Sequence, residues 1–68
     1  MRVYMSISAI SEQLKKKRNL KRINLSEVSK AIGVDVGQLS RIERGKCRYL
    51  SKNLIKYCKY LGVHHDVN

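Results

Sequence analysis

One stretch, residues 24–45, constrains the fold of this chain more than any other part of it. It holds two short amphipathic patterns, one with Val28 and Ile32 on a single face and one with Leu39 and Ile42. Apolar residues that recur at three- or four-residue spacing lie on the same side of an α-helix. The stretch therefore predicts two short helices in succession, each with one face turned to a core.

Each pattern begins with a capping signal. Asn24 and Glu27 have the spacing of a capping box, in which an N-cap side chain and the third helical residue satisfy each other's backbone N–H groups, and Asp35 and Gln38 repeat it. Gly33 lies where the chain must leave the first helix in the left-handed conformation that glycine adopts without penalty. Two short capped helices around a glycine turn predict a helix-turn-helix, and the remaining residues must supply the core that stabilises it.

The composition sets the class of protein and of partner. A chain of 68 residues makes one domain, and the absence of proline, phenylalanine and tryptophan favours an all-α fold. The net charge of +10 indicates a polyanionic partner, with nucleic acid first and an anionic membrane surface second. No apolar run approaches the roughly 20 residues that span a bilayer, and no signal peptide is evident. Cys47 and Cys58 do not form a CxxC pair, which favours a reducing compartment and a cytoplasmic protein.

The beginning of the chain predicts an arm followed by a helix. Residues 1–8 form the arm, which is either disordered or a short strand over residues 2–7 that pairs with a second copy of the chain. A helix is expected from Ala9 to about Arg18, with Ser8 as its N-cap. In the connection that follows, Leu20 and Ile23 are expected to turn inward.

The end of the chain predicts a last helix over residues 51–61, with Ser51 as N-cap and Gly62 as the stop. Its buried stripe carries Leu54, Cys58 and Leu61, with Tyr57 and Ile55 beside it. The predicted helix-turn-helix domain covers residues 9–63, and residues 64–68 form a tail.

These residues resemble the Cro and lambda-repressor type helix-turn-helix domains, the XRE family, from Leu14 to Val63. The most specific match is LSRIERG at 39–45, supported by AIGV at 31–34 and LGV at 61–63. The resemblance implies a compact bundle of four to five α-helices that binds double-stranded DNA as a transcriptional regulator. It also implies that Arg18 pairs with Glu43 as a structural pair, because a carboxylate facing DNA would repel phosphate.

Three positions depart from the family pattern. Leu25 stands where many relatives carry a glutamine that holds a phosphate, and Lys17 stands where a leucine is usual. The recognition helix begins with Val36 and Gly37, where polar side chains that read bases are common. Glycine costs a helix roughly 1 kcal/mol relative to alanine, so Gly37 suggests a close approach of the backbone to DNA.

The resemblance implies that the helix at about 36–44 enters the major groove, with Leu39 and Ile42 facing the core. Arg41 is the leading candidate for reading a base, because its fork matches the O6 and N7 acceptors of guanine. The expected base contacts are Val36, Gly37, Gln38 and Arg41. The expected phosphate contacts, which fix register without reading sequence, are Asn24, Ser26, Ser40, Arg44, Lys46 and Arg48.

Such a domain reads one half-site, so a homodimer on a pseudo-palindromic operator is expected. The dimer could form through residues 2–7 or through the helix at 51–61, which carries Tyr57 and Tyr60. Repression needs only occupancy of a promoter, so a repressor of bacterial, phage or plasmid origin is the default.

Other classes of function fit the sequence less well. The sequence contains no nucleophile with a neighbouring base, so an enzyme is not expected. No cofactor or small-molecule ligand is expected either. His64, His65, Cys47 and Cys58 lack the spacing of a zinc site, so no metal is expected. A membrane-surface peptide would need one long amphipathic face. An antitoxin or anti-repressor that uses the same fold on a protein partner remains the open alternative.

Overall fold

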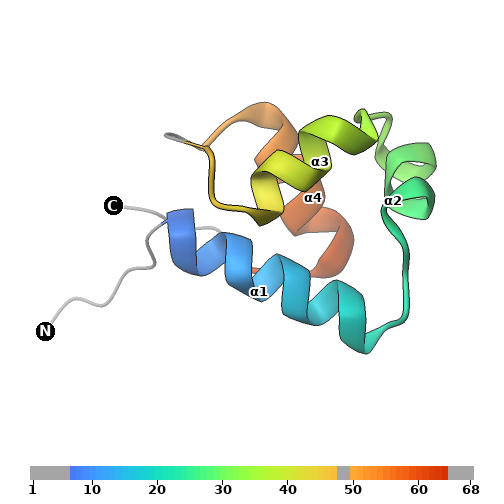
Figure 1. Ribbon diagram of the computed structural model, residues 1–68, viewed down its shortest axis with the longest axis horizontal. Helices are drawn as coiled ribbons and strands as arrows, with labels where there is room; N and C mark the ends of the chain where they lie inside the picture. Colours follow the sequence, from blue (N-terminus) through green and yellow to red (C-terminus); the bar gives the residue numbers. More distant parts are fainter. Residues whose placement is uncertain (1–6, 48–49, 65–68) are drawn as a thin grey trace, which may run out of the picture.

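The computed structural model describes residues 7–47 and 50–64, and within these ranges the chain forms four α-helices and no strand (Figure 1). The helices are α1 (Ile7–Leu20), α2 (Leu25–Ile32), α3 (Val36–Glu43) and α4 (Lys52–Leu61). The predicted all-α fold with four helices is confirmed.

The four helices enclose one core. In Figure 1, α1 runs along one side of the molecule, α3 lies beside it, and α2 lies at the far end of both. α3 packs on α1 and α2, and α4 packs on the same two helices. The buried apolar residues come from all four helices and the segments after α2 and α4: Ile10, Leu14, Val28, Val34, Leu39, Ile42, Leu54, Tyr57, Cys58, Leu61 and Val63.

The predictions for α4 are confirmed. The hydroxyl of Ser51 accepts a hydrogen bond from the backbone N–H of Leu54 at 3.2 Å, which makes Ser51 the N-cap. Leu54, Cys58 and Leu61 are buried along one stripe, and Gly62 ends the helix. Burial raises the pKa of the Cys58 thiol to about 11. Cys58 is therefore an unreactive core residue.

Two details predicted for α1 are wrong. The helix begins at Ile7, which packs against the core, so Ser8 lies inside the helix instead of capping it. Leu20 is 82% exposed because its spacing from Leu14 turns it away from the buried stripe. Ile23 is half-buried against the core, as predicted. Of the predicted arm, residues 1–6 lie outside the described part of the chain.

The end of α1 has an unusual backbone. Arg22 has a φ of 55° and is the one non-glycine residue with positive φ among residues 7–47 and 50–64. A left-handed conformation costs a residue with a side chain roughly 1–2 kcal/mol. Lys17, on the last turn of α1, is half-buried and donates from Nζ to the carbonyl oxygen of Gly62 at 3.3 Å, which ties α1 to the end of α4.

Candidate nucleic-acid interface

The two helices of the predicted helix-turn-helix are set by their caps. Oδ1 of Asn24 accepts from the backbone N–H of Glu27 at 2.9 Å, and α2 begins there as predicted. Gly33 leaves α2 in the left-handed conformation with a φ of 70°, and its N–H donates to the carbonyl oxygen of Ser29 at 2.8 Å. This turn brings α3 across α2.

The cap of α3 differs in its partner from the prediction. Oδ2 of Asp35 accepts from the N–H of Gly37 at 2.9 Å, so the cap uses the second helical residue and not Gln38. A carboxylate at the N-cap can reach either of these two amides. A Cβ on residue 37 would lie 2.9 Å from the same oxygen. A side chain at position 37 would therefore crowd the capping carboxylate, which gives a structural reason for a glycine here.

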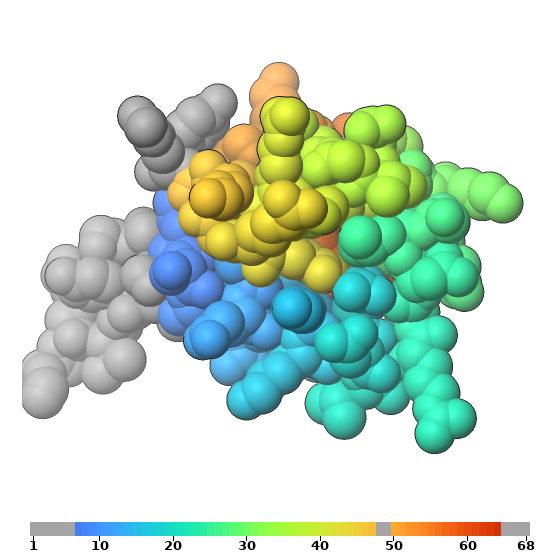
Figure 2. Space-filling model, viewed as in Figure 1, coloured from blue at the N-terminus to red at the C-terminus, as the bar shows by residue number. Residues whose placement is uncertain are grey.

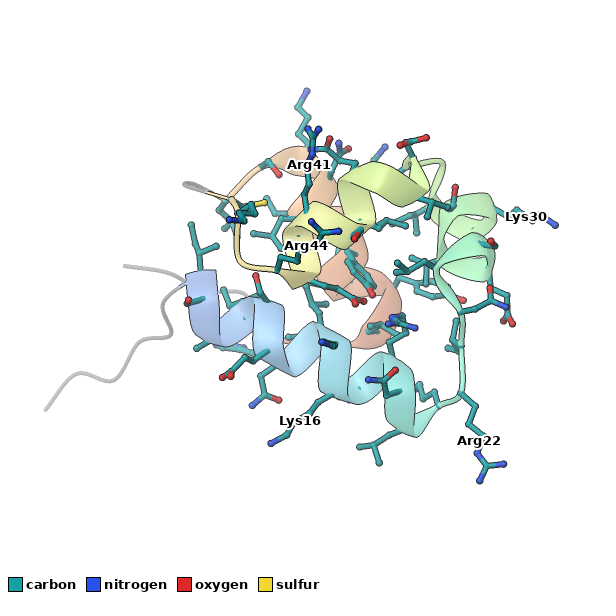
Figure 3. The ribbon with its side chains drawn as sticks, in the orientation of Figure 1. Lys16, Arg22, Lys30, Arg41 and Arg44 are labelled. Atoms are coloured by element: carbon teal, nitrogen blue, oxygen red, sulfur yellow. The ribbon has the colours of Figure 1, made fainter. Side chains whose placement is uncertain are left out.

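α3 has an inner face and an outer face. Leu39 and Ile42 are fully buried on the inner face, as predicted. Gly37, Arg41 and Arg44 are exposed on the outer face. Figure 3 shows the side chain of Arg41 projecting from α3 away from the body of the molecule.

The remaining predicted contact residues lie around this outer face. Val36 is 39% exposed, Gln38 and Ser40 are half-buried, and Lys46 is exposed just after the helix. Arg48 lies outside the described residues.

At the start of α2, Asn24 and Ser26 are exposed. Oδ1 of Asn24 accepts from Glu27, and the groups of Asn24 that can donate to a phosphate are its amide Nδ2 and its backbone N–H.

The end of α3 is held by a network of hydrogen bonds on the inner side. Nε of Arg18 donates to Oε2 of Glu43 at 2.6 Å, and Nη2 donates to Oε1 at 3.0 Å, a bidentate pair. The pair implied by the family resemblance is therefore present. The hydroxyl of Tyr57 on α4 donates to the same carboxylate, and Nη1 of Arg18 donates to the carbonyl oxygen of Ile23 at 2.8 Å. The network joins α1, α3, α4 and the connection before α2.

The side chains of this network are largely shielded from solvent. The side chains of Arg18 and Glu43 are 15% and 7% exposed, and Tyr57 is fully buried. Hydrogen bonding to Glu43 raises the pKa of Arg18, while burial and then the hydrogen bond to Glu43 raise that of Tyr57. Sequence reasoning missed Tyr57 as a partner of Glu43. Its position beside the buried stripe of α4 signalled burial but not the hydrogen bond.

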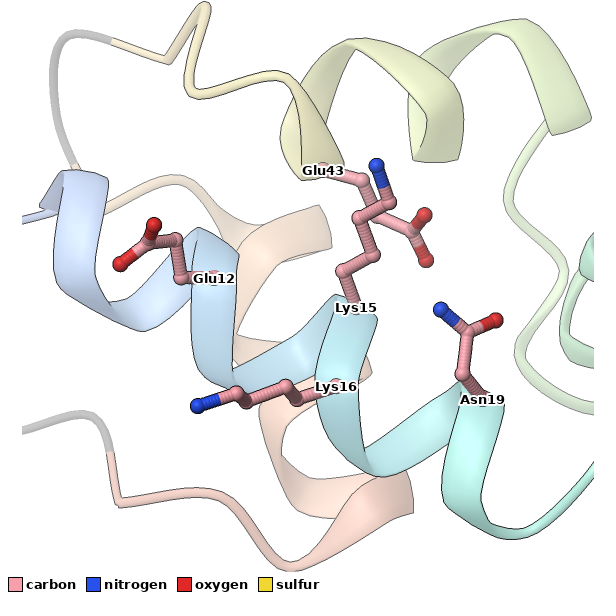
Figure 4. A pocket seen from close by; sticks show the side chains of 5 residues that line it. All are labelled: Glu12, Lys15, Lys16, Asn19 and Glu43. Atoms are coloured by element: carbon pink, nitrogen blue, oxygen red, sulfur yellow. The ribbon is translucent and has the colours of Figure 1, made fainter.

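A polar hollow lies between α1 and the end of α3 (Figure 4). Lys15 and Asn19 extend from α1 toward Glu43, and Glu12 and Lys16 complete the lining. Figure 2 shows that α1, α3 and the start of α2 share one face of the molecule. Lys15 and Lys16 on α1 and Arg44 at the end of α3 are exposed cations.

Other kinds of site find little support in the described residues. Among them, no group of three or more histidine, cysteine, aspartate or glutamate side chains could hold a metal ion. Cys47 and Cys58 are free thiols, and His65 of the zinc alternative lies outside the described residues. None of the helices described is long and apolar enough to cross a bilayer.

Comparison with known proteins agrees with this geometry. A helix-turn-helix family model, HTH_3, matches residues 14–68 and so includes all of α2, α3 and α4. The comparisons with curated proteins and with solved structures returned no match. Domains of this family are typically not enzymes. The matched region covers most of the chain, so the chain belongs to the Cro/C1-type (XRE) helix-turn-helix family, whose membership implies that it binds DNA.

Proposed function

We propose that the protein is a sequence-specific transcriptional regulator that places α3 in the major groove of DNA. The observation that carries this proposal is the outer face of α3, where Gly37, Arg41 and Arg44 are exposed while Leu39 and Ile42 anchor the opposite side. A major groove admits one α-helix and presents a distinct pattern of donors and acceptors for each base pair.

Base reading is assigned to the first two turns of α3. Arg41 donates to guanine O6 and N7, and Gln38 reads adenine because the cap of α3 leaves its amide unused. Val36 contacts a thymine methyl group, and Gly37 lets the backbone approach the DNA.

Phosphate contacts fix the register of α3 in the groove. Asn24 and Ser26 contribute from the start of α2, where backbone N–H groups and the helix dipole favour an anion. Ser40 and Arg44 contribute from α3, and Lys46 and Arg48 contribute from the loop that follows.

A single domain reads a half-site, so the protein is proposed to bind a pseudo-palindrome as a homodimer. Residues 2–6 of one candidate dimer surface lie outside the described residues, and Ile7 belongs to α1. On the other candidate surface, α4, Tyr57 is buried and cannot contact a mate, whereas Tyr60 is 40% exposed. The protein is further proposed to act in the cytoplasm as a repressor of bacterial, phage or plasmid origin, which represses by occupying a promoter.

Selection from a random pool of double-stranded DNA tests the proposal. The purified protein is taken through several rounds of selection at two salt concentrations, and the bound DNA is sequenced. We expect a pseudo-palindrome whose half-sites lie about one helical turn apart. No enriched sequence, with affinity that only falls as salt rises, would mean that the charge binds phosphate alone. The antitoxin or anti-repressor alternative would then be tested by searching for a protein partner.

A further inference from the structure

All four helices end in the same left-handed turn, but one of them does so without glycine. Gly33, Gly45 and Gly62 follow α2, α3 and α4 with φ between 70° and 73°. Arg22 follows α1 with a φ of 55°. Glycine has no Cβ and adopts this conformation freely, so the first three ends follow the common pattern for helix C-termini. Arg22 adopts the same conformation although its Cβ makes that conformation unfavourable.

Nothing within the described protein requires an arginine at this position. The turn is closed by backbone bonds, from the N–H of Ile23 to the carbonyl oxygen of Arg18 and from the N–H of Arg22 to that of Asn19, both at 3.1 Å. Glycine would form the same two bonds. The Arg22 side chain is exposed and makes no hydrogen bond or ion pair with any residue in the described ranges. A strained residue whose side chain has no partner within the protein suggests that the side chain binds a partner molecule.

The location of Arg22 indicates the kind of partner. It lies two residues before Asn24, the N-cap of α2, and Lys21 beside it is also exposed. Figure 3 shows the Arg22 side chain projecting from this end of the molecule into solvent. A guanidinium group is always charged and its fork matches two oxygens of a phosphate. Arg22 is therefore two residues from Asn24, one of the residues that the proposed function places against a DNA phosphate.

We propose that Arg22 binds a phosphate of the DNA backbone, adjacent to the phosphate at the start of α2. This inference rests on the proposed function and extends its footprint beyond the helix-turn-helix to the end of α1. The arginine is retained at a left-handed position for its side chain, at the expense of folding stability.

Replacing Arg22 with glycine separates binding from folding. Arg22→Gly removes the strain, so its thermal unfolding midpoint is expected to equal or exceed that of the wild type. A loss of DNA binding then cannot come from unfolding. Removal of one phosphate contact reduces the slope of log K against log salt by about 0.9. The affinity ratio of wild type to variant therefore shrinks by about 3.5-fold when salt rises from about 50 to 200 mM.

Two further variants serve as controls. Arg22→Lys keeps both the charge and the strain, so it should retain the salt slope of the wild type. Lys30→Gln removes an exposed charge at the opposite end of α2, and Figure 3 shows that side chain pointing away from Arg22. It should change the slope little.

The outcomes distinguish this inference from the function on which it rests. The inference on Arg22 alone is overturned if wild type binds DNA and Arg22→Gly binds with the same salt slope. Equal losses in Arg22→Gly and Lys30→Gln would also overturn it, because net charge would then explain both. A wild-type protein that does not bind DNA would overturn the proposed function and the role of Arg22 together.

Discussion

The inner and outer sides of α3 differ in how their polar groups are used. On the inner side, the carboxylate of Glu43 accepts hydrogen bonds from Arg18 and from Tyr57. On the outer side, Arg41 and Arg44 are exposed and have no hydrogen bond or ion pair from their side chains to any described residue. The inner side of α3 is therefore hydrogen-bonded to other helices of the protein, whereas the outer side is available to bind a partner.

This difference separates the residues that hold α3 in position from the residues that are proposed to read DNA bases. Eight residues form too short a helix to be stable alone, so α3 depends on its inner contacts for its position. Substitutions on the inner side should therefore lower the free energy of unfolding. Substitutions on the outer side should change DNA binding and leave stability nearly unaltered.

The largest effect on stability is expected for Glu43→Ala. The change leaves the guanidinium of Arg18 and the hydroxyl of Tyr57 without their shared acceptor, each largely out of solvent. Loss of one partner from a buried ion pair costs about 3 kcal/mol or more. Urea unfolding followed by circular dichroism measures it. Glu12→Ala, which removes an exposed acid from α1, is the matched control and should change stability by less than about 0.5 kcal/mol. Similar losses in both variants would contradict a special role for the network.

A smaller effect is expected for Tyr57→Phe. Phenylalanine fills the same space in the core but cannot donate to Glu43, and a hydrogen bond to a charged group is worth about 1.5–3 kcal/mol. The same unfolding experiment applies. Tyr60→Phe removes a hydroxyl from a half-exposed tyrosine of the same helix and should have no measurable effect. If Tyr57→Phe were equally silent, the ion pair alone would hold α3.

The smallest effect is expected for Gly37→Ala, at the border between the two sides. Alanine favours the helix by about 1 kcal/mol, but its Cβ displaces the Asp35 carboxylate, and loss of an N-cap costs a similar amount. The net change in stability should be near zero. In an Asp35→Ala background, the same substitution should stabilise the protein by about 1 kcal/mol. Equal effects in the two backgrounds would show that the cap does not explain the glycine.

Local signals predicted most of the fold. The caps at Asn24 and Ser51 and the glycine stops after α2 and α4 are short-range features, and the structure confirms them. The start of α1 was predicted two residues late because packing of Ile7 against the core extends the helix beyond its apparent cap.

Contacts between distant segments were harder to predict. The pair of Arg18 and Glu43 came from the family resemblance, since nothing in their spacing indicates it. Tyr57 could be placed near the core but not against Glu43. The conformation of Arg22 was not predicted, because arginine carries no signal for a left-handed turn. The base contacts remain predictions, because they depend on a DNA sequence that this chain does not reveal.

The most direct test of the separation between the two sides is Arg41→Ala. Its unfolding free energy and its affinity for the selected DNA site and for single-base variants of that site are measured together. The free energy of unfolding should change by less than about 0.5 kcal/mol. Affinity for the selected site should fall by about 1–3 kcal/mol, with the preference lost at one base pair. A uniform loss across all sequences, or a clear loss of stability, would contradict the assignment of reading to the outer side of α3.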